Sequence, residues 1–249
     1  MIDARVIAHR GGAGLCPENT MAAFAAALAR GDPAVETDVA MTRDGVAVLV
    51  HDDTLERTGK DPRAVGELTY RELAGIDVGA WFDPAHRGER VPTLDELGDL
   101  MAARPVRLFL DFKHGDDRYP GIVDAVIRFA ARFGEERITL LSLNHAVIEA
   151  FRQRAPRLAS AYSIMRPPEA DWLARLPQGR GIAPSLRTLS VAMLVQARSE
   201  GRAVHAWTVR SQAEAELVVR LPVAGIITDR PDLAAFTAPP PGRSEVGAG

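Results

Sequence analysis

The regular alternation of short apolar segments with helical segments constrains the fold of this chain most. Eight segments have the length and composition of strands when Val46–Val50 is counted as an extension of the second one. The predicted strands are Arg5–His9, Ala34–Ala40, Val106–Phe112, Ile138–Leu143, Leu158–Ser163, Gly181–Ala183, Ala203–Val209 and Val223–Thr228. Helices are predicted between them, at Met21–Arg30, Leu94–Ala103, Tyr119–Phe133, Ala146–Arg154, Val191–Ser199 and Gln212–Leu221, with a last one from Pro231.

Strands that alternate with helices favour a parallel sheet. The chain has 249 residues, 47% of them hydrophobic, which is enough for one closed barrel. A doubly wound open sheet is the competing architecture, but the chain lacks the G-x-G-x-x-G fingerprint that would support it. We therefore predict an α/β protein with a (β/α)8 TIM barrel.

The predicted barrel forms a single domain over residues 1–237. Between residues 53 and 92, Gly, Pro and charged residues dominate, so we expect an irregular insertion after the second strand, with a helix at Thr69–Gly75. The Pro- and Gly-rich end, residues 238–249, is predicted to be a disordered tail.

Charge and cysteine content narrow the class of protein. A formal net charge of -3 argues against a general nucleic-acid binder, which needs clustered cations. The single cysteine, Cys16, excludes an intrachain disulfide. The first strand begins by Arg5, which leaves no room for a signal peptide, and no apolar run could span a bilayer. We expect a cytoplasmic protein without stable membrane insertion; the oligomeric state stays open.

Polar residues gather at the ends of the first predicted strands. His9 closes the first strand, Glu36 and Asp38 lie in the second, and His51 closes its extension. Asp111 and Lys113 end the strand that follows the insertion. Because strand side chains alternate, each pair two residues apart faces one side, and active sites of such barrels lie at these carboxyl ends.

Three carboxylates in one site repel one another unless a cation is present. Oxygen ligands suggest Mg²⁺ or Ca²⁺, with Mn²⁺ as a further candidate, held by Glu36, Asp38 and Asp111. The alternative is that these acids form a buried ion-pair network with Arg10 and Lys113, although such networks are seldom favoured for stability alone.

Two histidines beside these acids suggest proton transfer. One of His9 and His51 could accept a proton from a nucleophile while the other gives one to a leaving oxygen. Arg10 offers planar, bidentate donors that suit a phosphate. Trp207 is a candidate apolar wall of the site or a residue that fills the barrel.

The ordered motifs H-R-G, P-E-N-T, E-x-D and V-L-V-H-D, with a later acid-x-Lys strand, resemble the glycerophosphodiester phosphodiesterase family. The segments Ala206–Val209 and Gly225–Pro231 resemble the last two strands of that family, so the similarity extends from Val6 to about Phe236. Two positions depart from it. The family usually has Glu where this chain has Asp111, whose carboxylate reaches one methylene less far, and commonly Asn where this chain has Arg210.

The resemblance implies metal-dependent hydrolysis of a small glycerophosphodiester to glycerol phosphate and an alcohol, a step of lipid and glycerol metabolism. It implies that Glu36, Asp38 and Asp111 bind the metal, that His9 and His51 are the acid and base, and that Arg10 and Lys113 bind the phosphate. Glu18 of P-E-N-T is a further family position, which either orients the site or serves the start of the helix.

Three questions stay open at this stage. The nucleophile is water or the neighbouring glycerol hydroxyl of the substrate. The substrate could instead be a lysophospholipid, for which an apolar groove at residues 78–82 would be needed. A barrel that binds phosphate esters without catalysis is a third possibility, but binding alone does not need two histidines.

Overall fold

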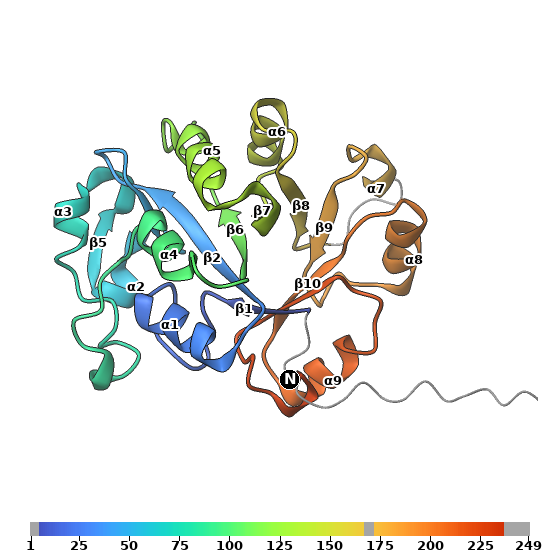
Figure 1. The fold of residues 1–249 in the computed structure, drawn as a ribbon, viewed down its shortest axis with the longest axis horizontal. Coiled ribbons are helices and arrows are strands. Elements are labelled where there is room, and N and C mark those ends of the chain that lie inside the picture. Colours follow the sequence, from blue (N-terminus) through green and yellow to red (C-terminus); the bar gives the residue numbers. More distant parts are fainter. Residues whose placement is uncertain (1–4, 167–171, 237–249) are drawn as a thin grey trace, which may run out of the picture.

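The computed structural model describes residues 5–166 and 172–236, and its centre is a barrel of eight parallel strands (Figure 1). Helices connect successive strands on the outside. The predicted (β/α)8 fold is confirmed. The eight strands are β1 (Val6–His9), β2 (Ala34–Met41), β6 (Arg107–Phe112), β7 (Ile138–Ser142), β8 (Ala159–Ile164), β9 (Gly181–Pro184), β10 (His205–Val209) and β11 (Gly225–Thr228).

The strands follow the order β10-β11-β1-β2-β6-β7-β8-β9, so the barrel closes between β9 and β10. Isolated bridges, and not a continuous ladder, make this seam. Bridges join Ile182 to Val204 and Ser185 to Trp207. Two hydrogen bonds accompany them, from Ile182 N to the Ala203 carbonyl (2.9 Å) and from Leu186 N to the Trp207 carbonyl (2.7 Å).

The longer helices begin where a side chain can accept from a free backbone amide. Thr20 caps α1, which ends at Gly31 in the left-handed conformation. Thr93 with Glu96, and Ser211 with Glu214, form capping boxes for α4 and α9. The helices are α1 (Met21–Arg30), α2 (Glu56–Gly59), α3 (Tyr70–Leu73), α4 (Leu94–Met101), α5 (Ile122–Phe133), α6 (His145–Arg154), α7 (Trp172–Arg175), α8 (Val191–Ser199) and α9 (Gln212–Val218).

The structure differs from the sequence-based expectation in three places. The segment Val46–Val50 does not extend the second strand: β3 (Ala47–Leu49) folds back and pairs with β2 in antiparallel orientation. Its apolar pattern fits either orientation, and the Thr42–Gly45 turn decides. A 3₁₀ turn, Ala234–Phe236, stands where a last helix was predicted, and the short helix α7 was not predicted.

The insertion after β3 is partly ordered into regular elements. It contains α2, α3 and a two-stranded sheet of β4 (Thr54–Leu55) and β5 (Asp61–Ala64). The predicted helix at Thr69–Gly75 is the short α3, capped by Thr69 and Glu72. The tail predicted at residues 238–249 lies outside the described residues, as do both ends of the domain predicted at 1–237.

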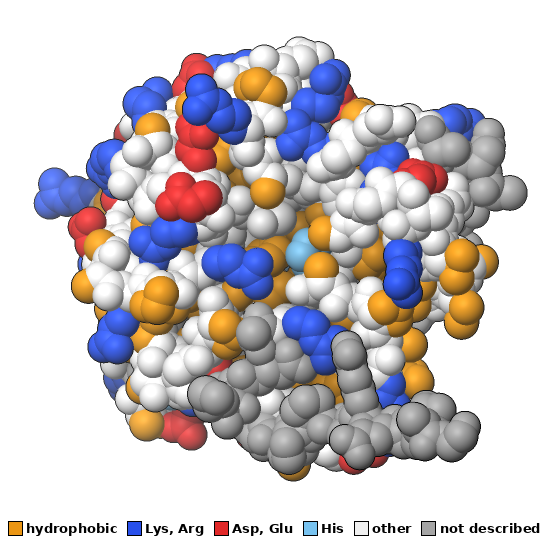
Figure 2. Space-filling view, turned by 45° about the vertical axis from the view of Figure 1, so that its right-hand side comes forward, with side chains coloured by type: hydrophobic (Ala, Val, Ile, Leu, Met, Phe, Trp, Pro, Cys, Tyr) orange, Lys and Arg blue, Asp and Glu red, His pale blue; other side chains and the backbone are white. Residues whose placement is uncertain are grey.

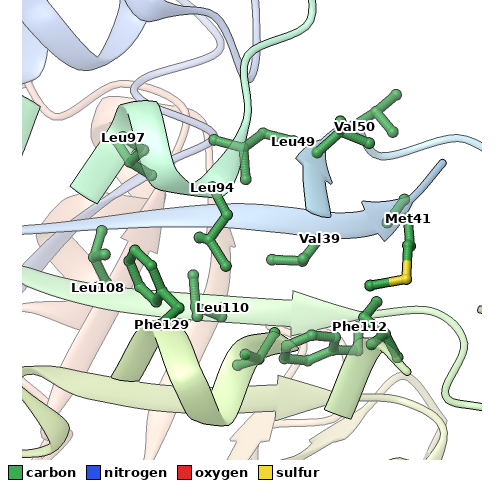
Figure 3. Packing of buried hydrophobic residues seen from close by; sticks show 14 of the residues in the cluster. Val39, Met41, Leu49, Val50, Leu94, Leu97, Leu108, Leu110, Phe112 and Phe129 are labelled. Carbon is green, nitrogen blue, oxygen red and sulfur yellow. The ribbon is translucent and has the colours of Figure 1, made fainter. Parts of the chain in front are cut away.

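The core consists of layers on the two sides of the barrel wall. Outside the wall, the largest cluster packs the strands against helices such as α4 and α5. Figure 3 shows part of this layer, with Leu94 of α4 close to Val39 of β2 and Leu110 of β6. Inside the wall, a smaller cluster fills the barrel, made of Ile7, Ala34, Phe109, Leu141, Ala161, Ala183 and Ile227.

The alternation along β1 and β2 determines which polar residues face the interior. Val6 and Ala8 pack outside, whereas Ile7 belongs to the interior cluster. His9, two residues after Ile7, therefore points to the inside at the carboxyl end of the strand. By the same alternation, Glu36 and Asp38, which follow interior Ala34 on β2, point to the inside of the barrel.

The surface mixes side chains of both charges. On the face in Figure 2, acidic and basic side chains are interspersed with hydrophobic ones around a central hollow, in which a histidine side chain is visible. Among residues 5–166 and 172–236, no helix has the length and apolar character that crossing a membrane requires.

A buried histidine at the start of β10 makes stability depend on pH. Burial, with a smaller effect of Arg107, lowers the pKa of His205 to about 4, and its buried Nδ1 has no hydrogen-bond partner among the described residues. In the unfolded chain His205 binds a proton near pH 6.5, whereas in the folded protein it stays neutral down to about pH 4. The contribution of neutral His205 to the free energy of unfolding is therefore complete above pH 6.5 and is lost as the pH falls towards 4.

We predict that wild type loses about 3 kcal/mol more than His205→Leu between pH 7 and pH 4. Urea unfolding at several pH values in this range measures the difference, in which the titration of carboxylates common to both proteins cancels. Parallel stability curves for the two proteins would contradict the prediction.

Candidate functional site

A cavity of about 390 Å³ lies at the carboxyl ends of the barrel strands. It is lined by eight of the residues that the sequence singled out as site residues: His9, Arg10, Glu36, Asp38, His51, Asp111, Lys113 and Trp207. Glu18, the ninth, is not among the described residues that line it. Segments as far apart in sequence as β1, the end of β3, β6 and β10 thus contribute to one site.

His9 is held from both sides of its ring. Its Nδ1 forms a short hydrogen bond with Oδ1 of Asp229, and its Nε2 lies 3.8 Å from Oε2 of Glu36. Burial lowers the pKa of His9, although the hydrogen bond that its Nδ1 donates to Asp229 acts in the opposite direction. A carboxylate only accepts hydrogen bonds, so Nδ1 carries the proton, and this bond leaves Nε2 available in a residue that lines the cavity.

The chain reverses direction directly after His9. Arg10 and Gly11 both have positive φ, 52° and 83°. This turn directs the Arg10 amide to Oε2 of Glu36 at 3.0 Å. At Gly11 a Cβ would lie 2.7 Å from Cβ of Ala23 in α1, so a larger residue would push the helix away from the site.

His51 forms a second histidine–carboxylate pair. Its Nδ1 lies 2.6 Å from Oδ1 of Asp52, whose Oδ2 accepts from Nε of Arg57 at 2.8 Å. Arg57 comes from α2 of the insertion. The insertion therefore helps to orient this imidazole, which leaves Nε2 for the cavity as in His9.

The three acids approach one another as predicted. β2 and β6 pair in a register that places Asp38 beside Asp111, and β1 pairs His9 with Glu36. One oxygen from each of Glu36, Asp38 and Asp111 lies within 4.8 Å of the others, and all three residues are buried. Lys113 binds two of them, donating to Oδ1 of Asp38 at 2.9 Å and, in a short contact, to Asp111.

The pKa values of the three acids shift in different directions. Burial, and then the charges of Asp38 and Asp111, raise the pKa of Glu36 well above its usual range. Burial also raises the pKa of Asp111, and Lys113 only partly offsets this. In Asp38 the balance is reversed, because Lys113 and Arg10 outweigh burial and lower its pKa. The three acids therefore do not respond alike to the same buried surroundings.

The P-E-N-T segment supports the site from behind. Glu18 accepts from Nη1 of Arg10 and from Arg57, each at 2.8 Å, and so fixes the direction of both cations. Asn19 donates to Oδ2 of Asp38 at 3.0 Å and accepts from Thr37. Thr20, not Glu18, caps α1. The geometry therefore agrees with an orienting position for Glu18 and not with helix capping.

The donors fit a hard divalent cation. Three carboxylates with one oxygen each within 4.8 Å of the others match the oxygen ligands of Mg²⁺ or Ca²⁺. The ion-pair network considered as the alternative also exists, since Arg10 and Lys113 both pair with Asp38. The two interpretations are compatible at this site.

Part of the cavity lining is apolar. Leu141, Leu143, Met165 and Ile227 line it together with Trp207, whose Nε1 donates to the carbonyl of Ala183. Trp207 thus combines both predicted positions, packing within the barrel and forming the wall. Val78 lines a separate, smaller hollow, so an apolar groove at residues 78–82 would not continue this wall.

Sequence reasoning missed the side chains that orient the reactive groups. Asp229, Asn19 and Asp52 each contact a predicted site residue, and Arg210 in turn donates from Nε to Oδ2 of Asp229 at 2.7 Å. A signal existed for Asp229, which directly follows the last strand in the way that His9 closes the first.

Comparisons with known proteins agree with this geometry. A model of the glycerophosphoryl diester phosphodiesterase family matches residues 9–233. The glycerophosphodiester phosphodiesterase of Caldanaerobacter subterraneus subsp. tengcongensis is 31% identical, covering 91% of this chain and 94% of the relative. The glycerophosphodiester phosphodiesterase of Bacillus altitudinis is 30% identical, covering 92% of this chain and 96% of the relative. The structure of an Oleispira antarctica phosphodiesterase in complex with the product sn-glycerol-3-phosphate has a TM-score of 0.80 at 26% identity, covering 91% of this chain and 93% of that one.

Removing the ammonium group of Lys113 tests the charge balance of the acids. Lys113→Met leaves the buried carboxylates without this partner, and we expect it to lower the free energy of unfolding by about 3 kcal/mol in EDTA. Millimolar Mg²⁺ or Ca²⁺ should restore part of the loss. Urea unfolding measures both effects. The double variant Lys113→Met/Asp111→Asn serves as the control, since removing one carboxylate should reduce the loss in free energy of unfolding. An unchanged midpoint in Lys113→Met would show that the acids do not depend on this cation.

Proposed function

The chain belongs to the glycerophosphoryl diester phosphodiesterase family, and on this premise we propose that it hydrolyses small glycerophosphodiesters to glycerol phosphate and an alcohol by acid–base catalysis with His9 and His51. The family membership makes it an enzyme that cleaves phosphodiesters. A barrel that only binds phosphate esters is therefore not the function. The product named for the Oleispira antarctica structure, sn-glycerol-3-phosphate, supports the substrate class.

The observation that carries the proposal is the pair of imidazoles on one cavity, each bound through Nδ1 to a carboxylate. In both rings Nε2 is free to exchange a proton with the substrate. A neutral imidazole accepts the proton of the attacking hydroxyl, and a protonated one gives a proton to the departing alcohol oxygen. Asp229 and Asp52 stabilise the imidazolium and hold each ring in orientation.

Two cations supply donors for the phosphate. In the described part of the chain, Arg10 donates from Nη1 to Glu18 at 2.8 Å, and its Nε lies 3.2 Å from Oδ2 of Asp38 as an ion pair. We propose that Nη2 donates to a phosphate oxygen. Lys113 uses two of its three donors on Asp38 and Asp111, and the third can point into the cavity that it lines. Both groups are held in place by acids, so little reorganisation is needed when substrate binds.

We propose that Glu36, Asp38 and Asp111 hold one divalent cation, Mg²⁺, Ca²⁺ or Mn²⁺. When bound, such an ion neutralises phosphate charge as a Lewis acid. Asn19 keeps the Asp38 carboxylate oriented by its 3.0 Å hydrogen bond, and the Arg10 amide does the same for Glu36. We further propose a cytoplasmic enzyme, in agreement with the lone cysteine of the sequence.

The acid–base assignment is tested by His9→Ala and His51→Ala. Each should lower kcat for glycerophosphocholine by about 10²- to 10⁴-fold, because proton transfer in the transition state is lost. Release of glycerol phosphate measures turnover, and circular dichroism confirms the fold. His86→Ala, outside the cavity, is the matched control and should keep wild-type turnover. If either site variant turns over at the wild-type rate, that histidine is not the acid or base.

The metal assignment is tested by chelation and by lengthening one ligand. EDTA should abolish hydrolysis, and titration with Mg²⁺, Ca²⁺ and Mn²⁺ should restore it. Asp111→Glu adds one methylene, and we expect it to lower the metal concentration for half-maximal activity, whereas Asp111→Asn should raise it about 10-fold or more because a charged ligand is lost. Calorimetry checks binding independently of turnover. Full activity in EDTA would remove the metal from the proposal.

A further inference from the structure

We propose that Arg210 selects the alcohol part of the substrate by charge, so that the enzyme favours alcohol groups that carry a carboxylate or phosphate over purely cationic ones. This inference rests on the proposed function and names the substrate class of the same site. Arg210 directly follows β10 and lines the cavity. Its side chain is 63% exposed, so it forms part of the rim and not of the floor.

Two contacts fix Arg210 at this rim. Its backbone amide donates to Oε2 of Glu214 at 2.7 Å, within the capping box that begins α9. Its Nε donates to Oδ2 of Asp229 at 2.7 Å. Among the described residues, the ion pair of Arg210 is formed through Nε, which leaves its two Nη nitrogens as a planar pair of donors for incoming ligands.

The carboxylate of Asp229 links Arg210 to the imidazole of His9. Asp229 accepts from Arg210 with one oxygen and binds His9 Nδ1 with the other. A substrate whose phosphate lies against Nε2 of His9 therefore extends one of its two arms towards this side of the rim. The glycerol arm is common to all substrates, so the charge of the other arm is what this guanidinium can distinguish.

Among the described residues that line the cavity, the charged side chains that reach solvent most have one sign. Its acids Glu36, Asp38 and Asp111 are buried, at 8% exposure or less. The charged lining residues that reach solvent most are Arg210 and Lys113, the second at 30%. Met165 and Leu143 complete the rim as exposed apolar side chains. A quaternary ammonium meets no exposed carboxylate among these lining residues, whereas a carboxylate or phosphate finds a bidentate partner.

Glycerophosphoserine and glycerophosphoethanolamine form a matched pair of probes, because they differ by one carboxylate. We expect kcat/KM of wild type to be about three- to tenfold higher for glycerophosphoserine, and the ratio to fall towards one with 0.5 M NaCl, since exposed charge pairs are screened. Arg210→Gln should bring the ratio close to one, Arg210→Glu should invert it, and Arg210→Lys should keep most of it. Glycerol phosphate release measures both substrates.

The controls separate this inference from the proposed function. All Arg210 variants are expected to lose some activity on both substrates, because Asp229 loses a partner, so the ratio and not the rate is the readout. Arg220 is exposed and is not among the residues that line the cavity. Arg220→Glu makes the same change in charge as Arg210→Glu and should leave the ratio unchanged. Hydrolysis of both probes by wild type at equal kcat/KM overturns the role of Arg210 and leaves the proposed function standing. Hydrolysis of neither overturns the proposed function itself.

If one variant does not fold, the salt dependence of the wild-type ratio is read together with the other. A preference for glycerophosphoserine that decreases with salt supports a rim cation, and whichever of Arg210→Gln and Arg210→Glu folds then distinguishes Arg210 from its neighbours by loss or inversion of the ratio. A ratio that neither salt nor any folded Arg210 variant changes overturns the inference.

Discussion

The burial of three carboxylates side by side is the constraint on which the site depends. Each is in a place where an isolated charge would be costly, and the pKa of Glu36 rises for that reason. Two cations, Arg10 and Lys113, reduce the repulsion between the carboxylates. Ion pairs with these carboxylates in turn hold both cations in place. The barrel can tolerate this arrangement because the strands that supply it are its best-paired ones, with six paired positions between β2 and β6.

A second group of side chains makes this charge arrangement usable. Asp229 and Asp52 orient the imidazoles, Asn19 orients Asp38, and Glu18 orients both Arg10 and Arg57. Arg57 belongs to the insertion, which thus takes part in the site through Asp52 and Glu18 instead of forming a lid of unrelated structure. Orientation by such partners is what allows a proton to move without prior rearrangement.

The sequence predicts the barrel and the shared location of His9, Glu36, Asp38 and Asp111, because the period of a strand decides which side chains share a face. It does not predict the partners that depend on closure. Asp229 meets His9 only because β11 pairs with β1, a contact between the two ends of the chain. Counting Val46–Val50 as an extension of the second strand was wrong, since its apolar pattern does not distinguish an extension from a strand that folds back on β2. Lys113, expected at the phosphate, also binds Asp38 and Asp111, which spacing alone cannot show.

The seam between β9 and β10 has a consequence for how this enzyme can change. Trp207 closes the barrel through its carbonyl and through Nε1, and the same residue forms the apolar wall of the cavity. A substitution that enlarges this wall would also remove contacts that join β9 to β10. New substrates are therefore easier to accommodate through rim residues such as Arg210, Met165 and Leu143, whose side chains are exposed, than through Trp207. One residue thus couples the closure of the barrel to the shape of its binding site.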